Sequence, residues 1–194
     1  IMERLVGSEM CIRDRSGIAE LMLDKGYSIQ GSDISVNDNT KRLKKKGIKF
    51  FLGHNKKNIK YAHAVVYSSA IKKNNPEIRE AYIKKIPVLS RADMLSELMK
   101  NKKSIAIAGS HGKTTTTSLV GNIFNEAGLD PTIVNGGIIN SFSNNNRYGK
   151  GEWMIVEADE SDGTFLKLPH RMSIITNLDI EHMDFYKSKK NLIN

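Results

Sequence analysis

Apolar residues in this chain occur in short blocks, and the blocks alternate between two kinds of spacing. Consecutive apolar residues bounded by Gly, Asn or Ser predict buried strands, whereas apolar residues three or four positions apart predict helices. The strands expected in the first half are Tyr27–Gly31, Ile48–Leu52, Ala64–Tyr67 and Pro87–Leu89. The expected helices include one around Ile18, Leu21 and Met22 that ends at Gly26, and then Asn39–Lys46, Asn75–Ile83 and Arg91–Met99. This alternation predicts a parallel sheet with helical crossovers.

The second half repeats the same pattern after a polar linker at Lys100–Lys103. One long helix is expected at Thr114–Ala127, and the expected strands are Ser104–Ala108, Pro131–Val134, Trp153–Ala158 and Met172–Thr176. The glycine pair Gly136–Gly137 is expected to start a loop, and the polar stretch Ser143–Gly151 is expected to be mobile. The fold class predicted from the pattern is therefore α/β, in two successive units.

The composition is that of a globular protein without a membrane-spanning segment. Of the 194 residues, 39% are hydrophobic and 26% are charged, and both values are ordinary for a globular domain. No run approaches the roughly 20 apolar residues that cross a bilayer. Residues 1–15 carry charges where a signal peptide has an apolar core, and the single Cys11 excludes an internal disulfide. We therefore expect a cytoplasmic protein with no membrane insertion.

The net charge of +9 is compatible with a nucleic-acid partner, but its distribution argues against one. Residues 1–99 hold 19 Lys and Arg against 11 Asp and Glu, whereas residues 100–194 hold 11 against 10. The lysines occur in short runs without interleaved aromatic residues, as on solvated helix faces. We expect no nucleic-acid partner, and an electrostatic preference of the first half for an anionic ligand stays open.

A glycine-containing loop joins the expected strand Ser104–Ala108 to the helix that follows. Its residues are Gly109, Ser110, His111, Gly112, Lys113, Thr114 and Thr115. In this position, backbone N–H groups and the helix N-terminus attract phosphate, the lysine reaches the β- and γ-phosphates, and the threonine hydroxyl ligates Mg²⁺. The general motif would place its first glycine at Ile107, so this loop is two residues shorter than usual. We predict an ATP phosphate loop, and a chance turn before a helix is the alternative.

Acidic residues follow the expected strand that begins at Trp153. They are Glu157, Asp159, Glu160 and Asp162. Ligands of open parallel sheets lie beyond the carboxyl ends of the strands, and carboxylates beside a triphosphate bind Mg²⁺. We predict a magnesium site here, and a solvated acidic turn is the alternative.

A histidine follows the next expected strand, Met172–Thr176, within the stretch TNLDIEHMD at 176–184. A single histidine is more often structural than functional. Because His182 comes after a third strand end of the same sheet, a metal or phosphate contact has at least equal weight.

These three motifs, in this order, resemble those of the Mur ligase family. The matching stretches are GSHGKTTTT at 109–117, EADESDGTFL at 157–166 and TNLDIEHMD at 176–184, and the first half adds GSD at 31–33, GH at 53–54 and SSAIKKNNPE at 68–77. The resemblance covers roughly residues 16–194. It implies a Rossmann-like UDP-sugar-binding domain at 16–99, followed by a partial P-loop-type, parallel-sheet central ATP-binding domain at 104–194.

The resemblance also implies a reaction, its cofactors and its substrates. The activity would be the ATP-dependent joining of L-alanine to the lactyl carboxylate of UDP-N-acetylmuramate through an acyl phosphate, which is a step in peptidoglycan precursor synthesis. The cofactors would be ATP and Mg²⁺, and the partners would be these two small-molecule substrates.

Site residues follow from the resemblance position by position. Lys113, Glu157 and His182 are implied as catalytic residues, and Thr114 joins Glu157 and His182 as a ligand of Mg²⁺. Asn177 is implied near the nucleotide, together with the loop residues 109–115. Asp33, His54 and Ser69 are implied at the UDP moiety, and a turn cap at Asp33 and an ordinary loop residue at His54 remain alternatives.

The chain departs from the family pattern at both ends. The family opens with a strand and a Gly-rich loop that receives the UDP pyrophosphate, but residues 6–15 contain no glycine pair and several charges. We therefore expect residues 1–15 to be a non-native, adapter-like segment and the Gly-rich loop to be missing. The chain also stops at Asn194, so we expect a truncated central domain and a fragment that is inactive by itself.

Two other functions compete with this interpretation. The relative that attaches a recovered tripeptide to UDP-N-acetylmuramate usually has tyrosine where Ser161 stands, so Ser161 favours L-alanine. A generic P-loop nucleotide-binding protein would need the standard loop length and would not need the SSAIKKNNPE stretch at 68–77.

Overall fold

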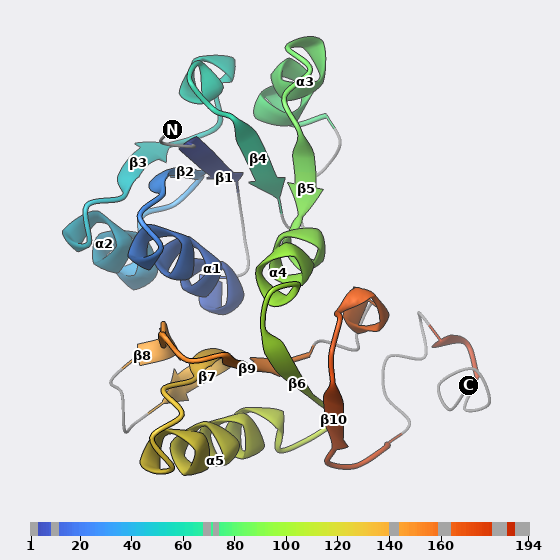
Figure 1. Ribbon diagram of the computed structural model, residues 1–194. Helices are drawn as coiled ribbons and strands as arrows, with labels where there is room; N and C mark the ends of the chain where they lie inside the picture. The colour runs from blue at the N-terminus through green and yellow to red at the C-terminus, as the bar shows by residue number, and fades with distance from the viewer. Residues whose placement is uncertain are drawn as a thin grey trace. The chain divides into compact units, whose positions relative to one another are not determined.

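Figure 1 shows the computed structural model, which describes residues 4–8, 12–67, 71, 74–139, 144–158, 164–179 and 186–188. The chain divides into two compact units, Ile1–Met94 and Leu95–Asn194. The division falls inside helix α4 (Arg91–Met99), a few residues before the linker expected at Lys100–Lys103. In the part of the chain that the structure describes, no helix is long and apolar enough to span a bilayer.

The first unit contains a parallel sheet with helices on both faces. Its strands are β1 (Arg4–Ser8), β2 (Ser28–Asp33), β3 (Lys49–Leu52), β4 (Ala64–Tyr67) and β5 (Val88–Ser90), in the order β3-β2-β1-β4-β5. Its helices besides α4 are α1 (Ile12–Asp24), α2 (Asp38–Lys45), the 3₁₀ turn η1 (Lys56–Ile59) and α3 (Pro76–Ile83). Helices α1 and α2 cover one face of the sheet, and η1 and α3 cover the other (Figure 1). The predicted α/β class with a parallel sheet is confirmed.

The central strand β1 was not predicted from the pattern. It lies within the segment expected to be non-native, yet it pairs in parallel with both β2 and β4. Because β2 and β4 lie on opposite sides of β1, the strand order reverses direction here, which is where ligands of such sheets bind. The non-native origin of residues 1–15 stays a prediction.

Two helices of the first unit begin at asparagine caps that the sequence supplies. The Asn37 side chain accepts a hydrogen bond from Thr40 N, and the Thr40 hydroxyl accepts one from Asn37 N, which forms a capping box at α2. The Asn75 side chain accepts from Glu77 N at 2.8 Å, and Pro76 occupies the first position of α3. The second cap fixes the start of the helix that carries Glu77.

The second unit contains a mixed sheet with one long helix packed on it. Its strands are β6 (Lys103–Ala108), β7 (Thr132–Ile139), β8 (Asn144–Arg147), β9 (Trp153–Glu157) and β10 (Met172–Ile175), in the order β10-β6-β9-β7-β8. All neighbouring pairs are parallel except β7 and β8, which are antiparallel. Helix α5 (Lys113–Glu126) packs on β7 and β9, and a 3₁₀ turn, η3 (Thr164–Lys167), precedes β10 (Figure 1).

The core of the second unit lies between α5 and the sheet. Ile105, Ile107 and Ile155 form a buried cluster, and Phe124 meets Trp153 edge to face with ring centroids 5.1 Å apart. Burial of these side chains from neighbouring strands and from α5 fixes the strand ends at one edge of the sheet.

One expectation for the region between β7 and β9 was wrong. Gly136 and Gly137 do not start a loop, because β7 continues through them to Ile139. The pattern also did not predict β8, which lies at the sheet edge within the stretch Ser143–Gly151, and the mobility of that stretch stays a prediction. Asn146 Oδ1 accepts a hydrogen bond from Asn135 N at 3.1 Å, so polar side chains, rather than alternating apolar residues, hold this edge strand.

The end of β8 is further tied to the start of β7 by a charge pair. Arg147 Nη2 donates to Asp130 Oδ1 at 2.5 Å, and Arg147 Nη1 donates to Pro131 O at 3.0 Å. The backbone N–H of Lys150, together with Arg147, holds the pKa of the Asp130 carboxyl below its ordinary value. These contacts join residues 16 to 20 positions apart, so the spacing of apolar residues along the sequence does not predict them.

Candidate functional site

The glycine-containing loop connects β6 to α5, as its sequence predicts. Gly109 has φ +130° and Gly112 has φ +78°, both in the region that favours glycine. Gly112 is the N-cap residue of α5 and provides no side-chain cap. The backbone N–H groups of the first turn of α5 therefore have no capping side chain, which is the arrangement that binds an anion at a helix N-terminus.

The ammonium group of Lys113 lies over this loop. Its Nζ donates to Gly109 O at 2.5 Å and to Ser110 O at 3.3 Å. The positive charge is thereby held beside the loop and the N-terminus of α5. This is the position from which a lysine can contact the phosphates of a nucleotide.

The structure brings together two residues that the sequence places 43 positions apart, Thr114 and Glu157. The Thr114 hydroxyl lies 3.2 Å and 3.1 Å from the two carboxylate oxygens of Glu157. The pairing of β6 with β9, in which Ile107 is opposite Glu157, places this carboxylate next to the loop. A hydroxyl and a carboxylate are both oxygen ligands of the kind that Mg²⁺ prefers, so the pair fits a magnesium site.

The other residues predicted to bind Mg²⁺ are not among those that the structure describes. His182 and the acidic residues Asp159, Glu160 and Asp162 lie outside the described residues. Within the described ranges, no three His, Cys, Asp or Glu side chains form a metal-binding group.

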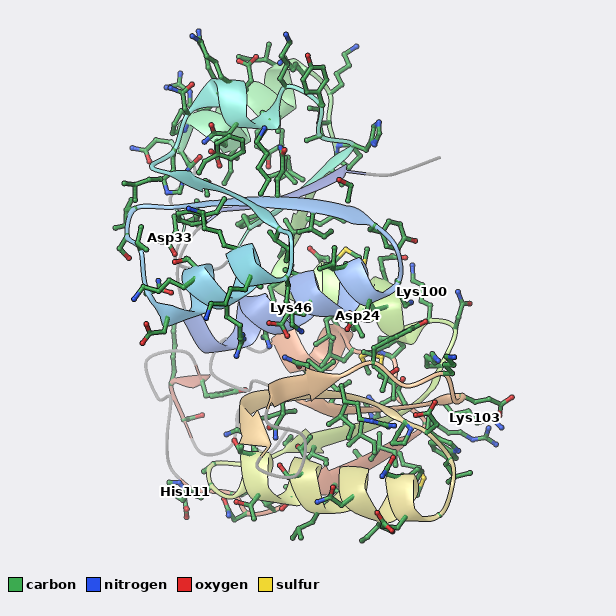
Figure 2. The ribbon with its side chains drawn as sticks, turned by 90° about the vertical axis from the view of Figure 1, so that its left-hand side faces the viewer. Asp24, Asp33, Lys46, Lys100, Lys103 and His111 are labelled. Atoms are coloured by element: carbon green, nitrogen blue, oxygen red, sulfur yellow. The ribbon has the colours of Figure 1, made fainter. Side chains whose placement is uncertain are left out.

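The segment after β10 forms a clamp on the loop. Asn177 Oδ1 accepts from His111 N at 2.8 Å, while Asn177 Nδ2 donates to His111 O at 3.0 Å. The Thr176 hydroxyl also donates to His111 O, at 2.6 Å, and Asp179 N donates to Ser110 Oγ at 2.9 Å. Figure 2 shows the His111 side chain projecting outward from the loop. The backbone of the loop is thus fixed by side chains from the third motif.

Sequence reasoning placed Asn177 near the nucleotide but did not identify the clamp or the part of Thr176 in it. The sequence offered one signal for this contact, because Thr176 and Asn177 lie at the end of a strand that belongs to the same sheet as the strand before the loop. The pairing of β10 with β6, which aligns Ile175 with Ala108, decides their contact with His111.

Replacing Asn177 with alanine is expected to weaken ATP binding by roughly tenfold, because His111 loses one hydrogen-bond partner at each backbone group. Isothermal titration of the protein with a non-hydrolysable ATP analogue measures this change. Leu178→Ala is the matched control, since Leu178 is the exposed neighbour of Asn177 at 55%. Equal affinities in the two variants would show that the clamp does not shape the nucleotide site.

In the first unit, Asp33 and His54 lie at the carboxyl ends of neighbouring strands. Asp33 is the last residue of β2 and His54 lies two residues beyond β3 (Figure 2 labels Asp33). Asp33 Oδ1 accepts from Ser35 N at 2.9 Å and from Ser35 Oγ at 3.3 Å, so Asp33 also has the turn-capping contact considered as its alternative. His54 Nδ1 lies 3.0 Å from Ser32 Oγ. Ser69 lies outside the described residues.

Two family models together match most of the chain. The model described as "Mur ligase family, catalytic domain" matches residues 9–103, and the model described as "Mur ligase middle domain" matches residues 107–194. Both parts of the chain are therefore similar to consecutive domains of one family.

Individual relatives agree with this assignment. The chain is 57% identical to the UDP-N-acetylmuramate–L-alanine ligase of Azorhizobium caulinodans over 173 residues, which cover 89% of this chain and 37% of that protein. The crystal structure of UDP-N-acetylmuramate–alanine ligase from Thermotoga maritima matches with a TM-score of 0.89 at 29% identity, over 99% of this chain and 45% of that one.

A second solved structure shares the fold. The UDP-N-acetylmuramate:L-alanyl-γ-D-glutamyl-meso-diaminopimelate ligase from Neisseria meningitides has a TM-score of 0.89 at 21% identity, over 99% of this chain and 65% of that one. The chain spans well under half the length of the curated relative described above, at 37%.

With both family models matched in order, at residues 9–103 and 107–194, the chain belongs to the Mur ligase family.

Proposed function

We propose that the complete enzyme containing this chain joins L-alanine to the lactyl carboxylate of UDP-N-acetylmuramate and converts ATP to ADP and phosphate. The observation that carries the proposal is the contact between Thr114 and Glu157 beside the Lys113 loop. The identity of 57% to a ligase with this printed name favours L-alanine over the tripeptide alternative. We place the reaction in the cytoplasm, where both ATP and nucleotide-sugar precursors occur.

The proposed reaction has two bond-forming steps. A lactyl carboxylate oxygen attacks the γ-phosphorus of ATP, the bond from this phosphorus to the β,γ-bridging oxygen breaks, and ADP leaves. The amine of L-alanine then attacks the acyl phosphate carbonyl and loses a proton, and inorganic phosphate leaves as the amide forms. A free carboxylate is a poor acyl donor, and the first step supplies its leaving group.

The residues of the second unit have distinct roles in this proposal. Lys113 neutralises charge on the β- and γ-phosphates, and the N–H groups at the start of α5 bind phosphate oxygens. Thr114 and Glu157, joined by His182, would hold Mg²⁺, which supplies electrostatic stabilisation of the transferring phosphoryl group. The loop residues Gly109 to Thr115 and the clamp residue Asn177 keep the phosphate site in shape.

The first unit is proposed to bind the UDP part of the sugar nucleotide. Asp33 is the last residue of β2 and His54 lies just beyond β3, at the edge at which such sheets bind ligands, and Ser69 is proposed to join them because it follows β4 (Ala64–Tyr67) in the sequence. The excess of basic residues in the first 99 positions favours an anionic ligand there.

The proposal is tested by measuring ADP release from the complete enzyme with ATP, UDP-N-acetylmuramate and L-alanine. We expect release only when all three are present. Release that needs neither the sugar nucleotide nor the amino acid would contradict the ligase function and favour a generic nucleotide hydrolase. Release with the tripeptide in place of L-alanine, but not with L-alanine, would favour the sibling ligase.

A further inference from the structure

The carboxyl group of Glu77 is fully buried at the start of α3, although the proposed function gives it no role. The side chain is 0% exposed. Its Oε2 accepts from Ser32 Oγ at 2.7 Å, and its Oε1 accepts from Asn58 Nδ2 at 2.7 Å and from Asn55 N at 3.2 Å. Three hydrogen bonds offset the cost of removing this carboxylate from water, so the folded chain provides a specific binding environment for the Glu77 side chain.

These three donors come from two separate parts of the first unit. Ser32 lies in β2, whereas Asn55 and Asn58 belong to the segment that follows β3. Asn58 also donates to Gly53 O at 3.2 Å and accepts from Gln30 Nε2 at 2.5 Å. One carboxylate on α3 therefore holds together the ends of two neighbouring strands, at the edge where the UDP moiety is proposed to bind.

The same contacts determine which nitrogen of His54 carries a proton. Ser32 Oγ lies between Glu77 Oε2, at 2.7 Å, and His54 Nδ1, at 3.0 Å. A serine hydroxyl has a single proton, and a carboxylate can only accept, so Ser32 donates to Glu77. Ser32 can then only accept from the ring, which requires a proton on Nδ1 of His54.

We propose that Glu77 is a positioning residue of the nucleotide-sugar site. Through Ser32 it holds His54 in the form with a proton on Nδ1. Through Asn55 and Asn58 it fixes the loop after β3. This inference rests on the proposed binding of the UDP moiety by the first unit. His54 Nδ1 is only 3.7 Å from Glu77 Oε2, so the buried negative charge also favours the protonated nitrogen on this side of the ring.

Glu77→Gln in the complete enzyme tests the positioning role. The amide keeps the size of the side chain, but it offers one oxygen and one NH₂ group where the carboxylate offers two oxygens. The NH₂ group cannot face the two donors Asn55 N and Asn58 Nδ2, so it must turn toward Ser32. The Ser32 hydroxyl then donates to His54, and the ring proton moves from Nδ1 to Nε2.

Two measurements follow this change. Titration calorimetry is expected to show affinity for UDP-N-acetylmuramate reduced about tenfold or more, with affinity for ATP unchanged. Nitrogen-15 NMR of the histidine ring at pH 8, above the ordinary imidazole pKa, is expected to show Nδ1 protonated in the parent and unprotonated in the variant. A purely structural role of Glu77 would not reverse the tautomer.

The matched control is Glu80→Gln on the same helix, where the carboxylate pairs at 3.2 Å with the neighbouring Lys84. It is expected to change neither measurement. If Glu77→Gln retains both sugar-nucleotide affinity and the Nδ1 proton, the proposal is overturned. If that variant does not fold, Ser32→Ala removes the hydroxyl that links Glu77 to His54 and leaves the Asn55 and Asn58 contacts to Glu77 in place, and unchanged affinity for UDP-N-acetylmuramate in it would overturn the role of this link.

The outcome also separates this inference from the proposed function. A parent enzyme that does not bind UDP-N-acetylmuramate would contradict the proposed function of the first unit. The NMR comparison of parent and variant would still decide whether Glu77 controls His54.

Discussion

Replacing Lys113 with alanine is expected to lower ADP release by the complete enzyme about 10³-fold or more, because the cationic partner of the β- and γ-phosphates is removed. The Lys113 ammonium group lies 2.5 Å from Gly109 O, and Lys113 is the only Lys or Arg in the loop sequence 109–115. Steady-state measurement of ADP release with all three substrates gives the size of the effect. The fall should appear mainly in kcat, since charge develops on the transferring phosphoryl group.

Lys100→Ala is the matched control for this prediction. Lys100 is an exposed lysine that pairs with Glu97 on α4, and its removal subtracts the same charge without touching the loop. We expect its turnover to equal that of the parent. Retained turnover in Lys113→Ala would place the nucleotide elsewhere in the chain.

Gly109→Ala is expected to lower ATP affinity about 100-fold, because no side chain fits at this position of the loop. A Cβ on Gly109 would lie 2.2 Å from Thr176 Oγ1 and 2.9 Å from Asn177 O, and the backbone has φ +130°. To relieve this overlap, the loop and the clamp after β10 must separate, which breaks the hydrogen bonds to His111. Overpacking of this kind costs roughly 1–3 kcal/mol, so the thermal midpoint of unfolding should fall as well.

Gly128→Ala separates strain in the backbone from overlap with the clamp. Gly128 follows the same helix α5, has φ +71°, and has no atom within 4 Å of the position of an added Cβ. We expect it to reduce thermal stability slightly and to leave ATP affinity unchanged. If both glycine variants bound ATP equally well, close contact between the loop and the clamp would not be needed for the nucleotide site.

The fold was predictable where burial and periodicity agree. Val65 and Ile107 are fully buried in strands that read as consecutive apolar residues, and helix α4 has the bounds that its pattern predicts. The pattern failed at β8, where the Asn146 side chain bonds to Asn135 N in β7 and Arg147 bonds to Pro131 O just before β7. Such contacts depend on which segments meet, and no local spacing encodes them.

Residues of the candidate site were predictable where they lie at or just after the carboxyl ends of parallel strands. Thr114 and Glu157 were expected to lie together because each follows a parallel strand of one sheet, and they do. The clamp on His111 and the buried Glu77 were missed for a different reason. A buried acid and an asparagine in a loop look the same in sequence as solvated ones, and only the fold shows which donors surround them.

The contacts of Lys113 with Gly109 O and Ser110 O have a consequence for the thermodynamics of nucleotide binding. A lysine that is mobile in water loses up to about 2 kcal/mol of side-chain entropy when it is immobilised. Here the side chain is already ordered by the carbonyl groups of its own loop, so its entropy is lost when the chain folds and not when the nucleotide binds. Binding then exchanges carbonyl oxygens for more strongly charged phosphate oxygens, and its gain should be largely enthalpic, with a small entropic penalty at this residue.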